Sequence, residues 1–103
     1  MTIVTIFRSR LRPGVDADYQ VVAEEMSSIA RSMDGFIDEK FFLAADGERV
    51  TVVRFADRTS QRAWAEQPGH VKAQQRGHYE FYSWYDFSVP KESYHHVFEI
   101  QQP

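Results

Sequence analysis

The amino-acid sequence predicts an α+β fold in which strands and helices follow one another in the order β-α-β-β-α-β. Two observations support this order. Apolar residues alternate in separate segments, which is typical of strands, and recur at helical spacing between some of these segments. The dipeptide Asp46-Gly47 lies between two of the alternating segments, and it is typical of a tight β-hairpin turn.

The first strand is predicted over Ile3–Leu11, because β-branched and aromatic residues predominate there. Ile3 and Phe7 point to one side of this strand, whereas Val4 and Ile6 point to the other. Both faces are therefore apolar, which indicates that both are covered in the folded protein.

The first helix is predicted over residues 16–33, where the apolar residues form one stripe and charged residues lie opposite it. Asp16 is expected to cap its start. Gly35 is expected to end it in the left-handed conformation that glycine adopts easily. Two strands then follow over residues 36–45 and 48–56, joined by the hairpin turn.

The second helical region is predicted to consist of two pieces. The first piece begins near Asp57 or Thr59 and breaks before Pro68, which suits the first turn of a new helix. The second piece ends at Arg76, and Gly77 is expected to stop it.

The last strand is predicted over residues 78–89, followed by residues 91–103 as a terminal strand or tail. Strict alternation places Tyr82 and Trp84 on one mixed face with His78. The opposite, apolar face is expected to be core and consists of Tyr79, Phe81, Tyr85, Phe87 and Val89.

This order of elements is that of a ferredoxin-like domain, a four-stranded antiparallel sheet with helices on one face. The 103 residues are expected to form one domain with its own core. Because the strands are apolar on both faces and the helices cover only one, we expect a homodimer through the other face. Symmetric dimers are the commonest assembly.

Composition excludes several classes of function. The formal net charge of -3, with both signs interspersed, predicts no nucleic-acid partner. No stretch predicts a membrane span or a secretion signal, so a cytoplasmic location is expected. Cysteine is absent, which excludes disulfides and thiolate metal ligands. No metal site is predicted, because His95 and His96 are adjacent and point to opposite faces of a strand.

Trp64 and His70 are the candidate catalytic residues. Trp64 is expected either to anchor its helix to the sheet or to form the wall of a ligand pocket. His70 lies in the first turn of the short helix, where the helix dipole disfavours a positive charge. A neutral histidine suits proton transfer, although a capping or surface role is the alternative.

Tyr82, Trp84 and Arg8 are the candidate substrate-binding residues. Tyr82 and Trp84 share the mixed face of the last strand, which is expected to line a dimer barrel or the polar part of a pocket. Arg8 lies on the first strand and could bind an anionic or phenolate group, although a solvated position on the sheet is the alternative.

Several short motifs resemble those of the antibiotic biosynthesis monooxygenase family. They are the strand IVTIFRSRLRPG, the Asp34-Gly35-Phe36 turn, and Trp64 followed by Pro68-Gly69-His70 and Gly77. The resemblance extends over nearly the whole chain. It implies a dimeric α/β barrel with a pocket between the helices and the sheet of each subunit.

The resemblance also implies a reaction, the oxidation of a small aromatic, quinol or polyketide-type substrate by O₂ without a metal or flavin cofactor. In such enzymes the deprotonated substrate itself reduces O₂. Trp64 would form the pocket wall and His70 would transfer protons, whereas Tyr82 and Arg8 are placed by the fold and not by a motif.

Two alternatives remain open at this point. Haem-degrading enzymes of the same superfamily carry an Asn on the first strand and a His after the Trp, where this chain has Phe7 and Gln74. The missing histidine makes a haem enzyme the weaker interpretation. The other alternative is a non-catalytic ligand-binding or scaffold dimer, since one fold hosts many functions.

Overall fold

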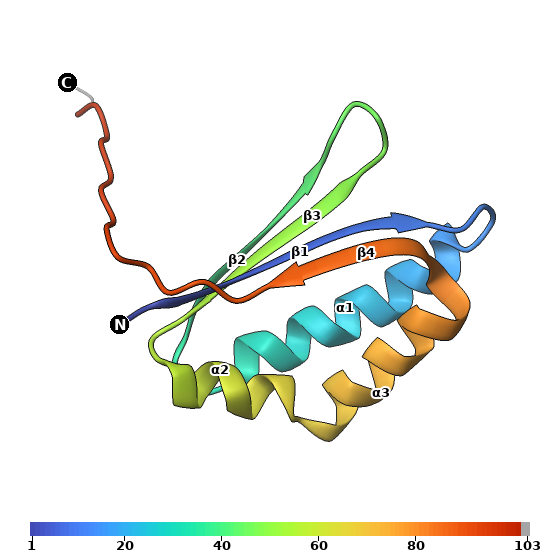
Figure 1. Ribbon diagram of the computed structural model, residues 1–103, viewed down its shortest axis with the longest axis horizontal. Coiled ribbons are helices and arrows are strands. Elements are labelled where there is room, and N and C mark those ends of the chain that lie inside the picture. The colour runs from blue at the N-terminus through green and yellow to red at the C-terminus, as the bar shows by residue number, and fades with distance from the viewer. Residues whose placement is uncertain (102–103) are drawn as a thin grey trace.

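The computed structural model describes residues 1–101 and confirms the ferredoxin-like α+β fold (Figure 1). The four strands form one antiparallel sheet in the order β2-β3-β1-β4. The elements are β1 (Ile3–Leu11), α1 (Asp16–Ser32), β2 (Phe36–Leu43), β3 (Arg49–Phe55), α2 (Arg58–Ala65), α3 (Pro68–Arg76), the π-helical turn η1 (Gly77–Phe81) and β4 (Tyr82–Ser88).

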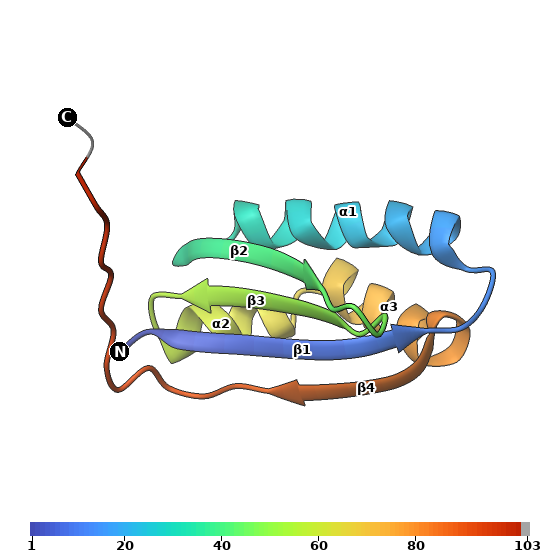
Figure 2. The ribbon, with the colours of Figure 1, turned by 90° about the horizontal axis from the view of Figure 1, so that it is seen from above.

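Within residues 1–101, the three α-helices lie on one side of the sheet and the other side carries no helix (Figures 1 and 2). We call these sides the covered face and the open face. The hairpin between β2 and β3 turns at Gly47, whose φ of 90° is the left-handed conformation predicted for this turn. Gly35 likewise has a φ of 82°, as predicted for the residue that follows the first helix.

The core lies between the covered face and the helices, in two clusters of buried residues. One cluster gathers around Tyr19 of α1 and Tyr82 of β4, with Val22 and Phe81. The other gathers around Trp64 of α2 and Phe55 of β3, with Ala30 and Val53. Phe55 and Ala30 are completely buried, so α1 and α2 are fixed to the central strand by apolar packing.

The third α-helix ends at Arg76 as predicted, but Gly77 does not end the helical backbone there. Gly77 has helical backbone angles, φ -57° and ψ -48°, and the chain continues through η1 before β4 begins at Tyr82. A side chain at Gly77 would collide with the ring of Tyr82. Glycine is therefore required here for close packing against this ring, and not for a left-handed turn.

The start of β4 corrects a second prediction, that Tyr82 and Trp84 share a face. The pairing of β4 with β1 shifts between Arg10 and Leu11, so that Ser83 is an extra residue in the ladder. Tyr82 therefore turns to the covered face, where its ring lies 5.2 Å from that of Phe7. Trp84 stays on the open face.

One further expectation, the cap of the first helix, is not met. Asp16 is the first residue of α1, which starts after Val15 without a side-chain cap. Of the two forms expected for residues 91–103, a strand or a tail, residues 93–101 form a tail, residues 102–103 lie outside the described part, and the last pairing of this region joins Lys91 to Ile3. The tail points away from the domain (Figure 1), and its apolar side chains are exposed, namely Tyr94, Val97, Phe98 and Ile100.

Candidate functional site

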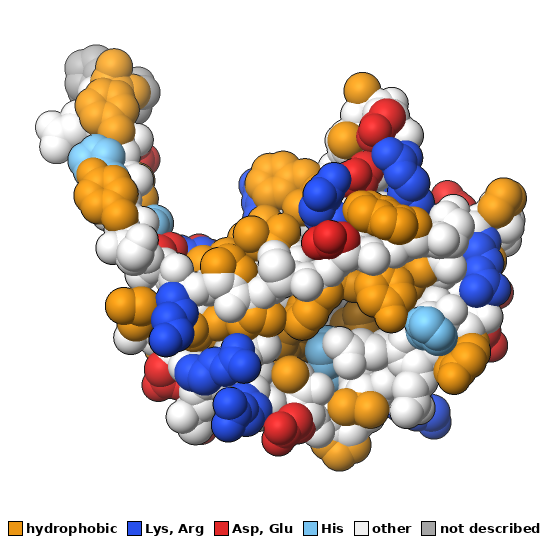
Figure 3. All heavy atoms as spheres, viewed as in Figure 1, with side chains coloured by type: hydrophobic (Ala, Val, Ile, Leu, Met, Phe, Trp, Pro, Cys, Tyr) orange, Lys and Arg blue, Asp and Glu red, His pale blue; other side chains and the backbone are white. Residues whose placement is uncertain are grey.

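A cavity of about 620 Å³ lies between the covered face and the helices. Hydrophobic side chains gather along this hollow in the space-filling view (Figure 3). Its lining comes from every strand and every α-helix: Thr5, Phe7, Tyr19, Gln20, Ala23, Glu24, Met26, Ser27, Arg31, Glu39, Phe41, Arg49, Thr51, Val53, Trp64, His70, Gln74, Tyr82, Tyr85 and Phe87. Such a volume suits a small molecule of a few rings.

Trp64 and His70 stack on each other at one end of the cavity, with ring centroids 4.2 Å apart. Trp64 also packs on Phe55, at 5.2 Å between centroids. The break at Pro68 produces the stack, because the Gln67 side chain accepts the His70 backbone N–H at 2.8 Å and caps α3. Trp64 is 6% exposed and His70 3%, so both side chains are fixed by packing.

Burial lowers the pKa of His70 below its ordinary value, and the Ala65 carbonyl opposes this only in part. His70 is therefore neutral near pH 7. The predicted protonation state agrees, but the main physical cause is burial and not the helix dipole. The Ala65 oxygen lies 3.5 Å from Nδ1 of His70 and can only accept a hydrogen bond. This contact favours the tautomer with a proton on Nδ1 and a free electron pair on Nε2.

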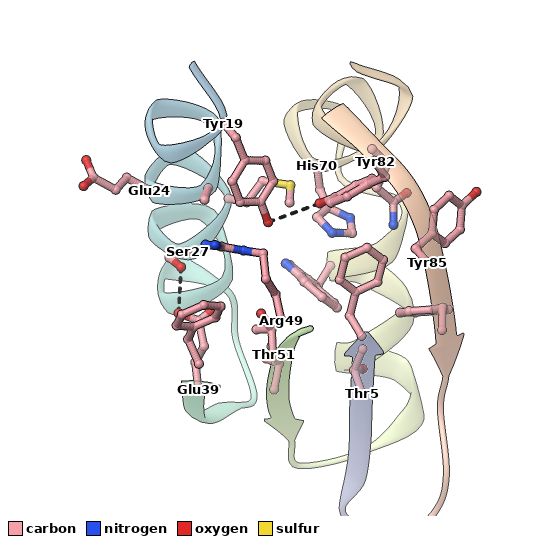
Figure 4. Close-up of a pocket in the computed structure, with 18 of the residues that line it drawn as sticks. Thr5, Tyr19, Glu24, Ser27, Glu39, Arg49, Thr51, His70, Tyr82 and Tyr85 are labelled. Carbon is pink, nitrogen blue, oxygen red and sulfur yellow. Dashed lines mark hydrogen bonds between the residues drawn. The ribbon is translucent and has the colours of Figure 1, made fainter. Parts of the chain in front are cut away.

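Tyr82 and Tyr19 form a hydroxyl pair on the cavity wall, with Tyr82 donating to the Tyr19 oxygen at 3.2 Å (Figure 4). Burial, more than the neighbouring Tyr19, raises the pKa of Tyr82, and the positive charge of Arg49 opposes the rise. Tyr82 is therefore a neutral hydrogen-bonding group in the cavity and not a base.

Arg8 and Trp84 do not line the cavity, contrary to their predicted role as residues of the substrate pocket. Alternation along β1 places Arg8 on the open face, opposite in direction to Phe7. Arg8 donates two hydrogen bonds to Glu48, at 2.7 and 3.0 Å, and its guanidinium lies 5.4 Å from the Trp84 ring centroid. Both residues belong to the surface network of the open face.

Three buried polar atoms have no hydrogen-bond partner within residues 1–101: Thr5 Oγ1, Arg49 Nε and Trp64 Nε1. All three residues line the same cavity. Buried polar groups in native proteins are nearly always hydrogen-bonded, so these three groups in one cavity lining are expected to bond water or a ligand. All three atoms can donate, which favours a ligand with acceptor oxygens.

The sequence analysis missed Thr5 and Arg49, although a signal was present. Thr5 lies two residues after the buried Ile3 and points to the same face of β1. Arg49 likewise points to the same face of β3 as the buried Val53 and Phe55. A polar residue in step with the core side of a strand is expected to meet a partner or a pocket.

Within the described residues, no three His, Asp or Glu side chains come together as a metal site would require. Phe7 and Gln74, at the two positions considered for a haem enzyme, both line the cavity. His70 is the one histidine on the lining. None of the helices in residues 1–101 is long and apolar enough to span a membrane.

These features define a class of protein, a small α+β domain with a cavity between its sheet and its helices. The chain belongs to the antibiotic biosynthesis monooxygenase family, whose sequence profile matches residues 2–76. The sequence has no significant match among curated proteins.

Solved structures with the same fold cover almost the whole chain. Rv0793 from Mycobacterium tuberculosis superposes with a TM-score of 0.84 at 18% identity, covering 94% of this chain and 100% of Rv0793. SnoaB from Streptomyces nogalater, a cofactor-independent oxygenase, superposes with a TM-score of 0.76 at 14% identity, covering 91% of this chain and 95% of SnoaB. At identities this low, the similarity shows a shared fold and does not show a shared activity.

Proposed function

We propose that this protein is a cofactor-independent monooxygenase that oxidises a small aromatic, quinol or polyketide-type molecule with O₂. The observation that carries the proposal is the cavity itself. It is mainly apolar, it holds a buried neutral histidine, and it contains unpaired hydrogen-bond donors. Membership of the family and the shared fold with the oxygenase SnoaB support the same activity.

The reaction needs a base and a site that stabilises an anion. The free Nε2 of His70 would take a proton from a C–H group that is activated by a neighbouring phenol or carbonyl of the substrate. The resulting carbanion gives its electrons to O₂. A ring CH₂ group and one O₂ yield a C=O group and one water, so the substrate supplies all the electrons and no external reductant is consumed.

The other residues of the lining would bind and stabilise the substrate. The Trp64 indole, which packs against Phe55 and His70, would form part of the cavity wall, and its unpaired N–H can donate to the oxyanion formed on deprotonation. Thr5 offers a second donor. Tyr82 and Phe7 form part of the apolar wall, and a wall of this kind excludes water and strengthens these electrostatic interactions.

In a scaffold dimer without a ligand site, the cavity would be closed by its own aromatic side chains, for example by Trp64 packing against Tyr82. Trp64 instead pairs with Phe55 and His70, and Tyr82 pairs with rings of the opposite end of the core. The cavity is therefore open between them, which supports a function that uses it.

We also propose that the protein is a homodimer through the open face of the sheet. Val4, Ile6, Val50 and Val52 point to this side and are only half-buried in the single chain, and the Trp84 side chain beside them is 41% exposed. A second copy would cover these residues. Light scattering at micromolar concentration should give twice the mass of the chain, and a monomer there contradicts the proposed dimer.

Oxygen uptake tests the proposed activity directly. Purified protein, treated with a chelator, should consume O₂ when anthrone or a naphthohydroquinone is added, faster than the uncatalysed rate and in proportion to protein. Uptake equal to the uncatalysed rate with both substrates contradicts a monooxygenase of this class. A Soret band on titration with haem would instead support the haem alternative.

A further inference from the structure

Arg49 differs from the other strand arginines in having no counter-ion. Arg8 pairs with Glu48 at 2.7 Å, Arg10 with Asp46 at 2.8 Å, and Arg54 with Asp38 at 3.0 Å. These three arginines lie on the open face. Arg49 lies on the covered face, lines the cavity, and has no carboxylate oxygen within 4.0 Å in the part of the chain that the structure describes.

Two aromatic rings hold the Arg49 guanidinium in place. Its central carbon lies 4.7 Å from the Phe41 ring centroid and 5.2 Å from that of Tyr19. A cation is attracted to aromatic faces, so these contacts fix the side chain and favour its charge. Ring faces are poor hydrogen-bond acceptors, however, and the buried Nε of Arg49 remains unpaired.

The carboxylates that also line the cavity are engaged elsewhere. Glu39 accepts a hydrogen bond from Ser27 at 2.7 Å and lies 3.8 Å from Arg31 (Figure 4). Glu24 is exposed and accepts from Gln20 at 3.4 Å. The cavity thus contains a positioned positive charge whose counter-ion the described residues do not provide. Water can satisfy its donors, but an anionic ligand would also neutralise its charge.

We propose that the substrate is an aromatic carboxylate and that Arg49 binds its carboxylate group. Figure 4 shows Arg49 reaching from β3 toward Tyr19 and Ser27 of α1, whereas His70 lies across the cavity beside Tyr82. A carboxylate on Arg49 therefore directs the ring system toward Trp64 and His70, where the proposed oxidation takes place. This inference names the substrate class of the proposed function, and it depends on binding rather than on turnover.

A pair of matched ligands tests the inference. 2-Naphthoate and 2-naphthamide have nearly the same shape and differ in charge, and calorimetry at neutral pH gives both dissociation constants. Wild-type protein should bind 2-naphthoate about tenfold more tightly or better, because a hydrogen-bonded charge pair is stronger than a neutral one. Equal affinities, or no binding of 2-naphthoate at millimolar concentration, would overturn the inference.

Variants identify the residue responsible. Arg49→Met should bring the two affinities together, and Arg49→Lys should keep a smaller preference, because lysine keeps the charge and loses the planar fork of donors. Arg62→Met removes the same charge from an exposed position on α2 and should keep the wild-type preference. A preference that survives in Arg49→Met contradicts the assignment; if that variant does not fold, Arg49→Lys and the wild-type ratio decide.

The two proposals can fail separately. If the protein prefers the carboxylate ligand through Arg49 but consumes no O₂, the anion site is supported and the oxygenase activity is contradicted. If the protein consumes O₂ with neutral anthrone but binds both naphthalene ligands equally, the oxygenase activity is supported and the anion site is contradicted.

Discussion

The covered and open faces of the sheet are built from the same four strands, yet they place arginine in different surroundings. On the open face each of the three arginines lies beside a carboxylate and is part of a surface network. On the covered face Arg49 lies between two aromatic rings at the edge of a cavity, without a carboxylate partner among residues 1–101. Side-chain alternation in a strand therefore separates arginines that serve structure from one available to a ligand.

The same contrast applies to the two tryptophans. Trp64 on the covered side is 6% exposed, contacts His70, and has an unpaired indole N–H at the cavity. Trp84 on the open face is 41% exposed and lies under Arg8. If the chemistry is confined to the covered face, substitutions on that face should change turnover and matched substitutions on the open face should not.

Replacing His70 should have the largest effect on turnover. His70→Ala removes the proposed base, and loss of a general base typically lowers kcat by about 100-fold or more. Oxygen uptake with anthrone measures the change, and light scattering checks that the assembly is the same as in the wild type. His70→Gln, which fills more of the space, separates loss of the base from loss of packing. Unchanged activity in both variants shows that His70 does not transfer the proton.

Replacing each tryptophan by phenylalanine compares the two faces directly. Trp64→Phe keeps a ring against His70 and removes the N–H, so kcat/KM should fall by about tenfold, as expected for the loss of one hydrogen bond to an anion. Trp84→Phe should leave kcat/KM unchanged, since that residue does not line the cavity. Equal effects in the two variants contradict the assignment of the site to the covered face.

A methyl group at Gly77 should destabilise the folded protein, because it disturbs the contact between Gly77 and the Tyr82 ring. Gly77→Ala leaves the helical backbone angles allowed, but the added carbon meets the Tyr82 ring. Overpacking of this kind costs about 1–3 kcal/mol in the free energy of unfolding. Denaturant unfolding measures it, with Ala63→Gly on the exposed surface of α2 as a control for helix propensity. A Gly77→Ala variant as stable as wild type would contradict the close contact.

The smallest effect is a difference in acid sensitivity between the faces. Because the pKa of buried His70 is lowered in the folded protein, its contribution to stability is complete above the ordinary value of 6.5 and is lost as the pH falls through the lowered value. The hydrogen bond from Arg8 lowers the pKa of Glu48 in the folded protein. The contribution of Glu48 to stability is therefore lost only as the pH falls below about 4.5. His70→Gln should flatten the pH dependence of stability near pH 6 and leave the acid limb unchanged. An unchanged slope near pH 6 would contradict the burial of a neutral His70.

Most of the fold could be predicted from local patterns. The hairpin at Asp46-Gly47 and the break before Pro68 depend on turn and proline geometry, which neighbouring residues largely determine. The π-helical turn and the bulge at Ser83 could not be predicted, because they accompany a close contact between the Tyr82 ring and Gly77 that the local sequence does not reveal. That fit depends on contacts between the end of α3 and the sheet.

Part of the candidate site was also predictable from local sequence patterns. Trp64 and His70 lie together at the cavity because the short break before Pro68 brings them into contact. Arg8 was assigned to the substrate from the expected fold and Trp84 from its alternation with Tyr82, and the direction of each side chain places them on the open face. Arg49 was missed, although its step along β3 with Val53 and Phe55 indicates the covered side.

The incorporation of isotopically labelled O₂ tests the central claim most directly. Chelator-treated protein that oxidises anthrone under labelled O₂ should place one labelled oxygen atom in each molecule of product and release the other as water. Loss of this labelled product in His70→Gln, but not in Trp84→Phe, would place the reaction on the covered face. A product without label, or formed at the same rate without protein, would contradict the proposed monooxygenase.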